Sequence, residues 1–128
     1  MTVYLSVPQV LALHALQVEH FGGARQVRNR AALESAVARP HATFDGDDLY
    51  PDLASKAAAL LHSLVQNHPF VDGNKRTGAM ACEFFVEINE HLLVATDDEL
   101  EDLVMATARG EFEQEALAIW IRQRLRTA

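Results

Sequence analysis

The 128-residue sequence has one cysteine, few basic residues and no long apolar run, and each shortage excludes a class of protein. Because Cys82 is alone, neither an intramolecular disulfide nor a cysteine-based zinc cluster can form. The 11 Lys and Arg against 18 Asp and Glu give a net charge of −7, which argues against nucleic acid as the main partner. No apolar segment approaches the ~20 residues of a membrane span, and the N-terminal residues lack the features of a signal peptide. We therefore expect a cytoplasmic protein that binds neither nucleic acid nor membrane directly.

The rest of the composition is that of an ordinary globular protein. Hydrophobic residues make up 49% and charged residues 23% of the chain, which disfavours intrinsic disorder. A chain of this length fits one domain and can bury roughly two-thirds of the surface that its unfolded state exposes. We expect residues 1–128 to form a single domain with one core.

The spacing of apolar residues predicts an all-α fold of about six helices. Ser6 is a candidate cap for the first, whose Val10, Leu13 and Leu16 are expected to face the core, and Pro51 suits the start of the third. The expected helices cover residues 7–20, 30–39, 51–68, 74–89 and 97–109, and a sixth follows Gly110. Two short strands fit residues 3–5 and 92–94.

The fourth predicted helix is apolar nearly all round between Ala79 and Val86, which is typical of a central, buried helix. Cys82 lies in this stretch, so we expect an inert core thiol rather than a reactive one. The six histidines include no pair at i, i+4, which argues against a histidine metal site.

Residues 68–77, with the sequence HPFVDGNKRT, form a loop that leads into this helix. The first backbone N–H groups of a helix are unpaired and its dipole is positive there, so a phosphate is stabilised at this place. Gly73 allows the backbone to turn tightly and to approach a ligand. Lys75 and Arg76 add two cations where a sequence optimised for stability alone would place acids. This pattern predicts an anion-binding site.

Two further side chains of the segment suit a transfer reaction. Asp72 can hold Mg²⁺, which often uses one carboxylate together with phosphate oxygens. His68 is suited to accept a hydroxyl proton at neutral pH. Together these residues predict a nucleotide-dependent transfer site, with Phe70 pointing the other way to anchor the loop in the core.

Each of these residues also has an ordinary structural interpretation when it is taken singly. His68 can simply end a helix, Asp72 can belong to a turn, Asn74 can cap the next helix, and Lys75 and Arg76 can be solvated. Their occurrence together and in this order favours the functional interpretation. The G-x-x-x-x-G-K-[ST] spacing of a P-loop is absent.

The segment resembles the motif of the Fic/Doc family, whose general form is H-x-F-x-D/E-G-N-G/K-R. The matching positions are His68, Phe70, Asp72, Gly73, Asn74 and Arg76. Lys75, where adenylylating members have glycine, makes the chain similar to the death-on-curing (Doc) toxins, as do residues 50–53 and 56–64. The resemblance covers most of the chain and implies a helical fold.

The resemblance also implies roles for the motif residues in moving a phosphate-containing group from ATP to a protein hydroxyl. His68 would be the base that activates the hydroxyl, and Asp72 would hold Mg²⁺ on the phosphates. The backbone around Gly73 and Asn74 would form the anion site, and Arg76 would neutralise phosphate charge.

Lys75 is expected to decide which group is transferred, because its chain would fill part of the space of a β-phosphate. Ala79 stands where adenylylating members carry a second arginine, which also disfavours AMP transfer. Doc members are toxins of type II toxin–antitoxin systems that phosphorylate elongation factor Tu and are restrained by a small antitoxin. The resemblance thus implies a kinase that inhibits translation. A Fic-type adenylyltransferase and a catalytically silent, antitoxin-binding member are the alternatives.

The acidic segment 41–52, HATFDGDDLYPD, is expected to be a loop, because it contains glycine, proline and four aspartates. Its acidic part, residues 45–48, can simply be solvated, whereas its place in the family suggests a flap beside the active site that could dock the target segment.

Overall fold

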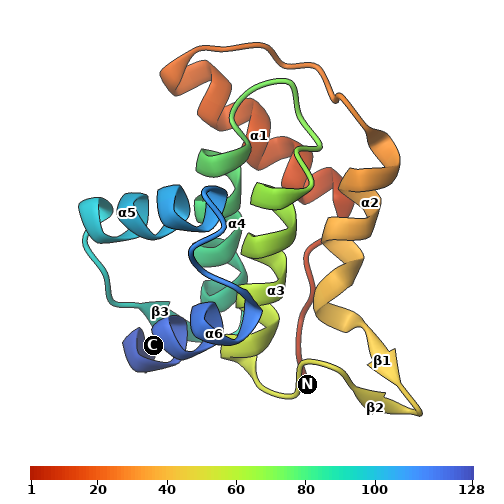
Figure 1. Cartoon of the computed structure of the whole chain (residues 1–128), viewed down its shortest axis with the longest axis vertical. Coiled ribbons are helices and arrows are strands. Elements are labelled where there is room, and N and C mark those ends of the chain that lie inside the picture. Colours follow the sequence, from red (N-terminus) through yellow and green to blue (C-terminus); the bar gives the residue numbers. More distant parts are fainter.

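The computed structural model describes all 128 residues and confirms an all-α architecture (Figure 1). The helices are α1 (Val7–Phe21), α2 (Arg30–Ala38), α3 (Leu53–Gln66), α4 (Asn74–Ile88), α5 (Asp97–Ala108) and α6 (Gln114–Arg124). A turn of 3₁₀ helix, η1 (Arg39–His41), follows α2. All six expected helices are present, and none has the length and apolarity that crossing a bilayer requires.

The core is built around α3, which packs against α2, α4, α5 and α6. Its alanines allow neighbouring helices to approach, and Leu60, Leu61 and Leu64 fill the space between them. α4 adds Phe85 and Cys82, which are both fully buried, so the expectation of a core cysteine is confirmed. α3 is the more completely buried of the two helices, although the sequence singled out α4.

Side-chain caps begin four of the six helices. Ser6, Asp52 and Thr96 form capping boxes at the starts of α1, α3 and α5, and Asn29 caps α2. Each cap satisfies N–H groups that a helix leaves unpaired at its start. Ser6 and Thr96 were expected, whereas Pro51 lies just outside α3 and the carboxylate of Asp52 takes the capping position.

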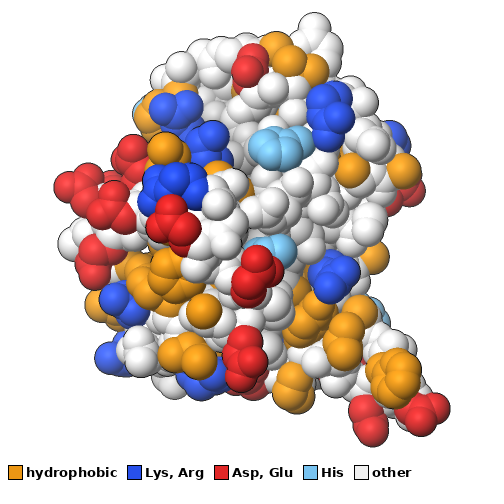
Figure 2. Space-filling model, viewed as in Figure 1, with side chains coloured by type: hydrophobic (Ala, Val, Ile, Leu, Met, Phe, Trp, Pro, Cys, Tyr) orange, Lys and Arg blue, Asp and Glu red, His pale blue; other side chains and the backbone are white.

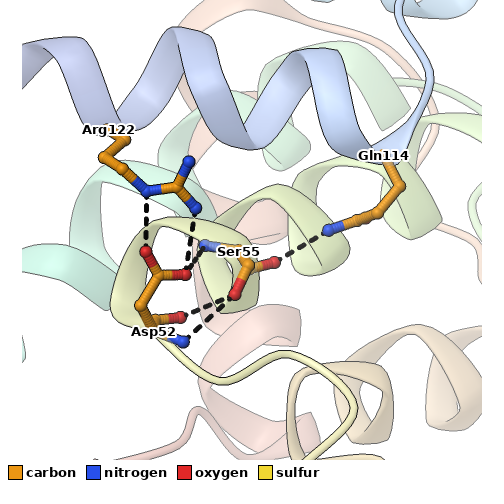
Figure 3. Close-up of polar contacts among 4 residues, drawn as sticks. All are labelled: Asp52, Ser55, Gln114 and Arg122. Atoms are coloured by element: carbon orange, nitrogen blue, oxygen red, sulfur yellow. Dashed lines mark hydrogen bonds and ion pairs between the residues drawn. The ribbon is translucent and has the colours of Figure 1, made fainter.

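The start of α3 is also bound to α6 by a polar network (Figure 3). Arg122 donates hydrogen bonds of 2.7 and 3.2 Å to the two carboxylate oxygens of Asp52. The backbone N–H of Ser55 donates to the same carboxylate at 3.0 Å, and Gln114 donates to the Ser55 carbonyl at 2.9 Å. The hydrogen bond from Arg122 holds the pKa of Asp52 well below its ordinary value, so the capping carboxylate stays charged.

The strands are short and form two antiparallel pairs. β1 (Thr43–Phe44) pairs with β2 (Asp47–Asp48), and β3 (His91–Leu93) pairs with β4 (Leu125–Thr127). A strand was expected at 92–94 and is present one residue earlier. Residues 3–5 form no strand, because Val3 exchanges backbone hydrogen bonds of 2.8 and 2.9 Å with the Asn89 side chain instead.

The β1–β2 hairpin lies at the opposite end of the molecule from the loop between α3 and α4 (Figure 1). The expectation that segment 41–52 forms a flap beside the site is therefore wrong. The hairpin precedes the first residue of α3 and the loop follows its last, and a helix of 14 residues is about 21 Å long.

Candidate functional site

The loop between α3 and α4, residues 67–73, runs alongside the segment that connects α1 to α2. The backbone N–H of Arg28 donates to the Pro69 carbonyl at 2.8 Å. Val27 and Phe70 form an isolated antiparallel bridge. Residues 22–29, rather than 41–52, therefore lie beside the motif.

His68 combines a fixed backbone with an exposed side chain. Its φ of 47° is left-handed, a region in which histidine is found more often than most residues. The Arg28 guanidinium donates to the carbonyl oxygens of His68 at 2.7 Å and of Asn67 at 3.0 Å. The imidazole makes no hydrogen bond within the protein and is accessible to a substrate.

Phe70 and Asn74 hold the middle of the loop in one conformation. The side-chain oxygen of Asn74 accepts from the Phe70 N–H, and its amide donates to the Phe70 carbonyl, both at 3.0 Å. The Phe70 ring is 1% exposed and stacks on His14 with ring centroids 3.7 Å apart, which confirms its role as an anchor. The side chain of Asn74 is thus occupied, whereas its backbone N–H makes no hydrogen bond within the protein.

Asp72 is held through both its side chain and its main chain. One carboxylate oxygen, Oδ2, accepts from the Ala24 N–H at 2.8 Å. The main-chain carbonyl accepts from Nε2 of the buried His14 at 2.8 Å, which places the proton of this imidazole on Nε2. The exposed carboxylate keeps its second oxygen, Oδ1, without a hydrogen bond.

The first turn of α4 lacks any side-chain cap. Gly73 occupies the capping position with a left-handed φ of 82°. Thr77 N–H returns to the Gly73 carbonyl at 2.9 Å, but the N–H groups of Asn74, Lys75 and Arg76 make no hydrogen bond. These three free donors and the positive end of the helix dipole make the start of α4 suited to binding an anion.

A groove of about 560 Å³ opens from this helix start between α4 and α5. Lys75 and Arg76 lie at one end, and the Arg76 guanidinium lies 4.4 Å from the ring centroid of Phe21. The floor is apolar and includes Ala79, Met80, Leu100, Val104 and Met105. Figure 2 shows basic side chains near the meeting point of α1 and α4, beside acidic side chains over α5. The groove therefore presents positive charge next to an apolar surface.

The other end of the groove is acidic. Glu83, Asp97 and Glu101 line it, and the carboxyl of Glu83 is half-buried. Burial raises the pKa of Glu83, and the charges of Glu87 and Asp97 raise it further. A ligand with an anionic group at one end and hydrogen-bond donors at the other matches this distribution of charge.

The residues suit a magnesium ion bound together with phosphates rather than an ion held by the protein alone. No three His, Cys, Asp or Glu side chains converge on a metal position, and Asp72 offers one carboxylate oxygen next to the anion site. Mg²⁺ is commonly held by one or two carboxylates plus substrate phosphates. The donor set at the start of α4 fits such a pairing.

The structure gathers every predicted site residue around one loop, and it adds three that the sequence did not identify. His14 supports Asp72, Arg28 supports His68, and Gln17 is buried against Gly73. The first helix was expected to face inward through Leu16, but Leu16 is 53% exposed. The spacing of His14 and Gln17 at i, i+3 could have indicated that both lie on one face of the first helix, because such residues share a helix face.

Comparison of the sequence with known proteins shows its family. The sequence profile of the Fic/DOC family matches residues 4–86. Toxin Doc of Mycolicibacterium smegmatis is 44% identical over 120 residues, which cover 92% of this chain and 90% of the relative. Protein kinase doc of Escherichia phage P1 is 27% identical over 120 residues, which cover 94% of each chain. The chain therefore belongs to the Fic/DOC family, within its death-on-curing subfamily.

Proposed function

We propose that the chain is a protein kinase that transfers the terminal phosphoryl group of ATP to a protein hydroxyl. The observation that carries this function is the start of α4, with its unpaired N–H groups and the exposed Lys75 and Arg76. Phosphoryl transfer depends mainly on positioning and on neutralising charge. An uncapped, cationic helix start supplies both, because its donors are fixed by the helix.

In the proposed reaction the hydroxyl oxygen of the target bonds to the γ-phosphorus, while the bond from this phosphorus to the β,γ-bridging oxygen breaks. His68 accepts the hydroxyl proton, and ADP leaves with the electron pair of the broken bond. An exposed imidazole on a fixed backbone suits this role, since the base must reach a hydroxyl on a large substrate.

Asp72 is the residue that would hold Mg²⁺, which neutralises phosphate charge when it is bound. Its second carboxylate oxygen carries no hydrogen bond, and the Ala24 N–H fixes the first. We expect Asp72→Ala to raise the Mg²⁺ concentration required for half-maximal transfer, and excess Mg²⁺ to restore part of the activity. An unchanged Mg²⁺ dependence would exclude this role.

Lys75 and Ala79 favour phosphoryl transfer over AMP transfer. A lysine at position 75 occupies space next to the anion site, and Ala79 lines the groove where adenylylating members carry an arginine. The relative from phage P1 is named as a protein kinase, which supports the same choice.

The biological role that we propose is that of a type II toxin. One relative is named Toxin Doc, which supports a toxin restrained by a separate small antitoxin. By resemblance the target is elongation factor Tu, so modification would stop translation. Expression of the chain alone is expected to arrest bacterial growth, and co-expression of an antitoxin from the neighbouring reading frame is expected to relieve the arrest.

The deciding experiment is intact-mass analysis of elongation factor Tu after incubation with the chain, ATP and Mg²⁺. A gain of one phosphoryl group is expected. A gain of AMP would show an adenylyltransferase instead, and an unchanged mass would exclude elongation factor Tu as the target.

Lys75→Gly sharpens this experiment, because it opens the space beside the anion site and removes one cation. A phosphate misplaced by ~1 Å can lose on the order of 10²-fold in rate, so phosphoryl transfer should fall steeply and some AMP transfer should become detectable. Arg126→Gly removes an exposed cation at the far C-terminus and serves as the charge-matched control. Wild-type phosphoryl transfer by Lys75→Gly would show that Lys75 does not decide the reaction.

A further inference from the structure

Three buried side-chain polar atoms make no hydrogen bond, and all of them lie against the first turn of α4. They are Nε2 and Oε1 of Gln17 and Oγ1 of Thr77. Gln17 is 1% exposed and Thr77 is 0% exposed. Buried polar groups are paired in the large majority of cases, because an unpaired one lowers stability. Their concentration at one helix start indicates a region that is not optimised for stability alone.

The carboxamide of Gln17 lies directly against Gly73. A Cβ atom added to Gly73 would be 1.9 Å from Nε2 and 2.6 Å from Cδ of Gln17. Position 73 therefore has no room for a side chain, in addition to its left-handed φ. Gln17 does not line the groove, so it can affect a ligand there only through the Gly73 turn.

Gln17 belongs to a face of α1 that supports the anion site over three successive turns. His14 bonds to the Asp72 carbonyl at 2.8 Å, and Phe21 lies under the Arg76 guanidinium. Gln17 lies between them in the sequence and contacts Gly73, and positions i, i+3 and i+7 share a helix face. His14 and Phe21 each have a partner, whereas the carboxamide of Gln17 makes no hydrogen bond.

We propose that Gln17 is a positioning residue for phosphate binding, which acts through Gly73 and forms its hydrogen bonds with this turn when a phosphate occupies the start of α4. This role rests on the kinase site proposed above. A carboxamide can donate and accept, so it can pair with either the N–H or the carbonyl group of a peptide unit that adjusts to the ligand. An apolar side chain of similar size would fill the same space without an unpaired group, and a hydrogen bond formed in the ligand-bound state accounts for an amide at this position.

The first test replaces Gln17 with methionine, which keeps the volume and removes the polar atoms. We expect the Tm to rise by a few degrees, because the unpaired group is gone, while the affinity for ATP with Mg²⁺ falls roughly three- to tenfold, the value of one hydrogen bond. The measurements are thermal unfolding and calorimetric titration. Gln114→Met is the matched control, because its carboxamide is bonded to the Ser55 carbonyl far from the site. There the Tm should fall and the affinity should not change.

The second test needs no substitution. In the wild-type protein, NMR should show the side-chain amide of Gln17 shifting together with the backbone amides of Asn74, Lys75 and Arg76 as ATP and Mg²⁺ are added. The side-chain amide of Gln114 should not respond.

Binding by the wild type with no response of the Gln17 amide, or an affinity of Gln17→Met within twofold of the wild type, would overturn the role of Gln17. Either result leaves the proposed kinase site intact. Failure of the wild type to bind ATP with Mg²⁺ would contradict the kinase site itself and therefore also the role of Gln17.

Discussion

The two central helices of the protein follow each other in the chain but begin in opposite ways. α3 begins with Asp52, whose carboxylate accepts from Ser55 and from Arg122, and these polar groups satisfy one another (Figure 3). α4 begins with Gly73, which offers no side-chain cap. Lys75 and Arg76 follow at positions where acidic side chains would interact favourably with the helix dipole.

These two helix starts show that the groups that stabilise a helix differ from those that leave its start free to bind a ligand. A capped start has its donors occupied and gains roughly 1 kcal/mol for it. The α4 start lacks this gain and carries two unfavourable charges, yet it alone exposes donors and cations at the end of a groove. Substitutions at the α4 start should therefore lower binding or transfer without lowering stability, whereas substitutions at the α3 start should lower stability and leave transfer unchanged.

The largest effect is expected for His68→Ala, at the loop that leads into α4. Target phosphorylation should fall by roughly 10²–10⁴-fold, the usual contribution of a general base, with little change in Tm because the side chain is exposed. His68→Asn is the matched variant, since asparagine tolerates the left-handed backbone. Transfer at the wild-type rate by either folded variant would exclude His68 as the base.

The next effect tests the charge at the α4 start directly. Lys75→Glu should raise the free energy of unfolding by about 0.3–1 kcal/mol through the helix dipole, and lower ATP binding roughly tenfold or more by removing a charged partner of phosphate. Chemical denaturation and calorimetry measure the two quantities. Asp98→Lys in the first turn of α5 is the mirror control, because Asp98 is exposed and lies outside the groove. Asp98→Lys should lower the free energy of unfolding without changing ATP binding. If both variants changed stability and ATP binding in the same direction, the contrast between the two helix starts would be contradicted.

At the α3 start we expect the reverse pattern. Asp52→Ala should lower the free energy of unfolding by about 1–2 kcal/mol at pH 7, since it removes a cap and a half-exposed ion pair. Arg122→Ala should lose only the ion pair, about 1 kcal/mol or less.

The stability that Asp52 contributes should also depend on pH. Because the folded state lowers the pKa of Asp52, this contribution is present above the ordinary carboxyl pKa of about 3.9 and is lost as the pH falls below it. Phosphorylation per folded molecule should not change in either variant.

The smallest effect concerns Glu83, at the acidic end of the groove. Its pKa is raised by burial, so the folded state disfavours the charged form and wild-type stability is reduced above that pKa. Glu83→Gln should therefore raise the free energy of unfolding at pH 7, by less than about 1 kcal/mol because the side chain is only half-buried. The two proteins should converge in acid, and a gain that grew as the pH fell would contradict the assignment.

Much of the fold could be predicted from the sequence because helix formation depends on neighbouring residues. The capping box at Thr96 and the apolar spacing of Leu100, Leu103 and Val104 placed α5 correctly. The order of residues in the motif loop placed the site residues at the start of α4. Both signals lie within a few positions of the chain, where local geometry decides.

The errors arose where a partner is distant in the sequence. Apolar type alone favoured Leu16 as an inward residue of α1, but packing against the motif loop buries His14 and Gln17 instead. The strand β4 was missed because it is defined by its pairing with β3, more than 30 positions away. The segment 41–52 was placed beside the site although α3 separates the two.

The sequence by itself determined the helices, the motif and the types of group at the site, because each depends on residues that are close together in the chain. Only the tertiary structure decided which residues surround the motif. The bond from His14 to Asp72 spans 58 positions, and that from Arg28 to His68 spans 40. Contacts of this range depend on how the helices pack, and packing follows from the fit of all side chains in the core rather than from any one segment.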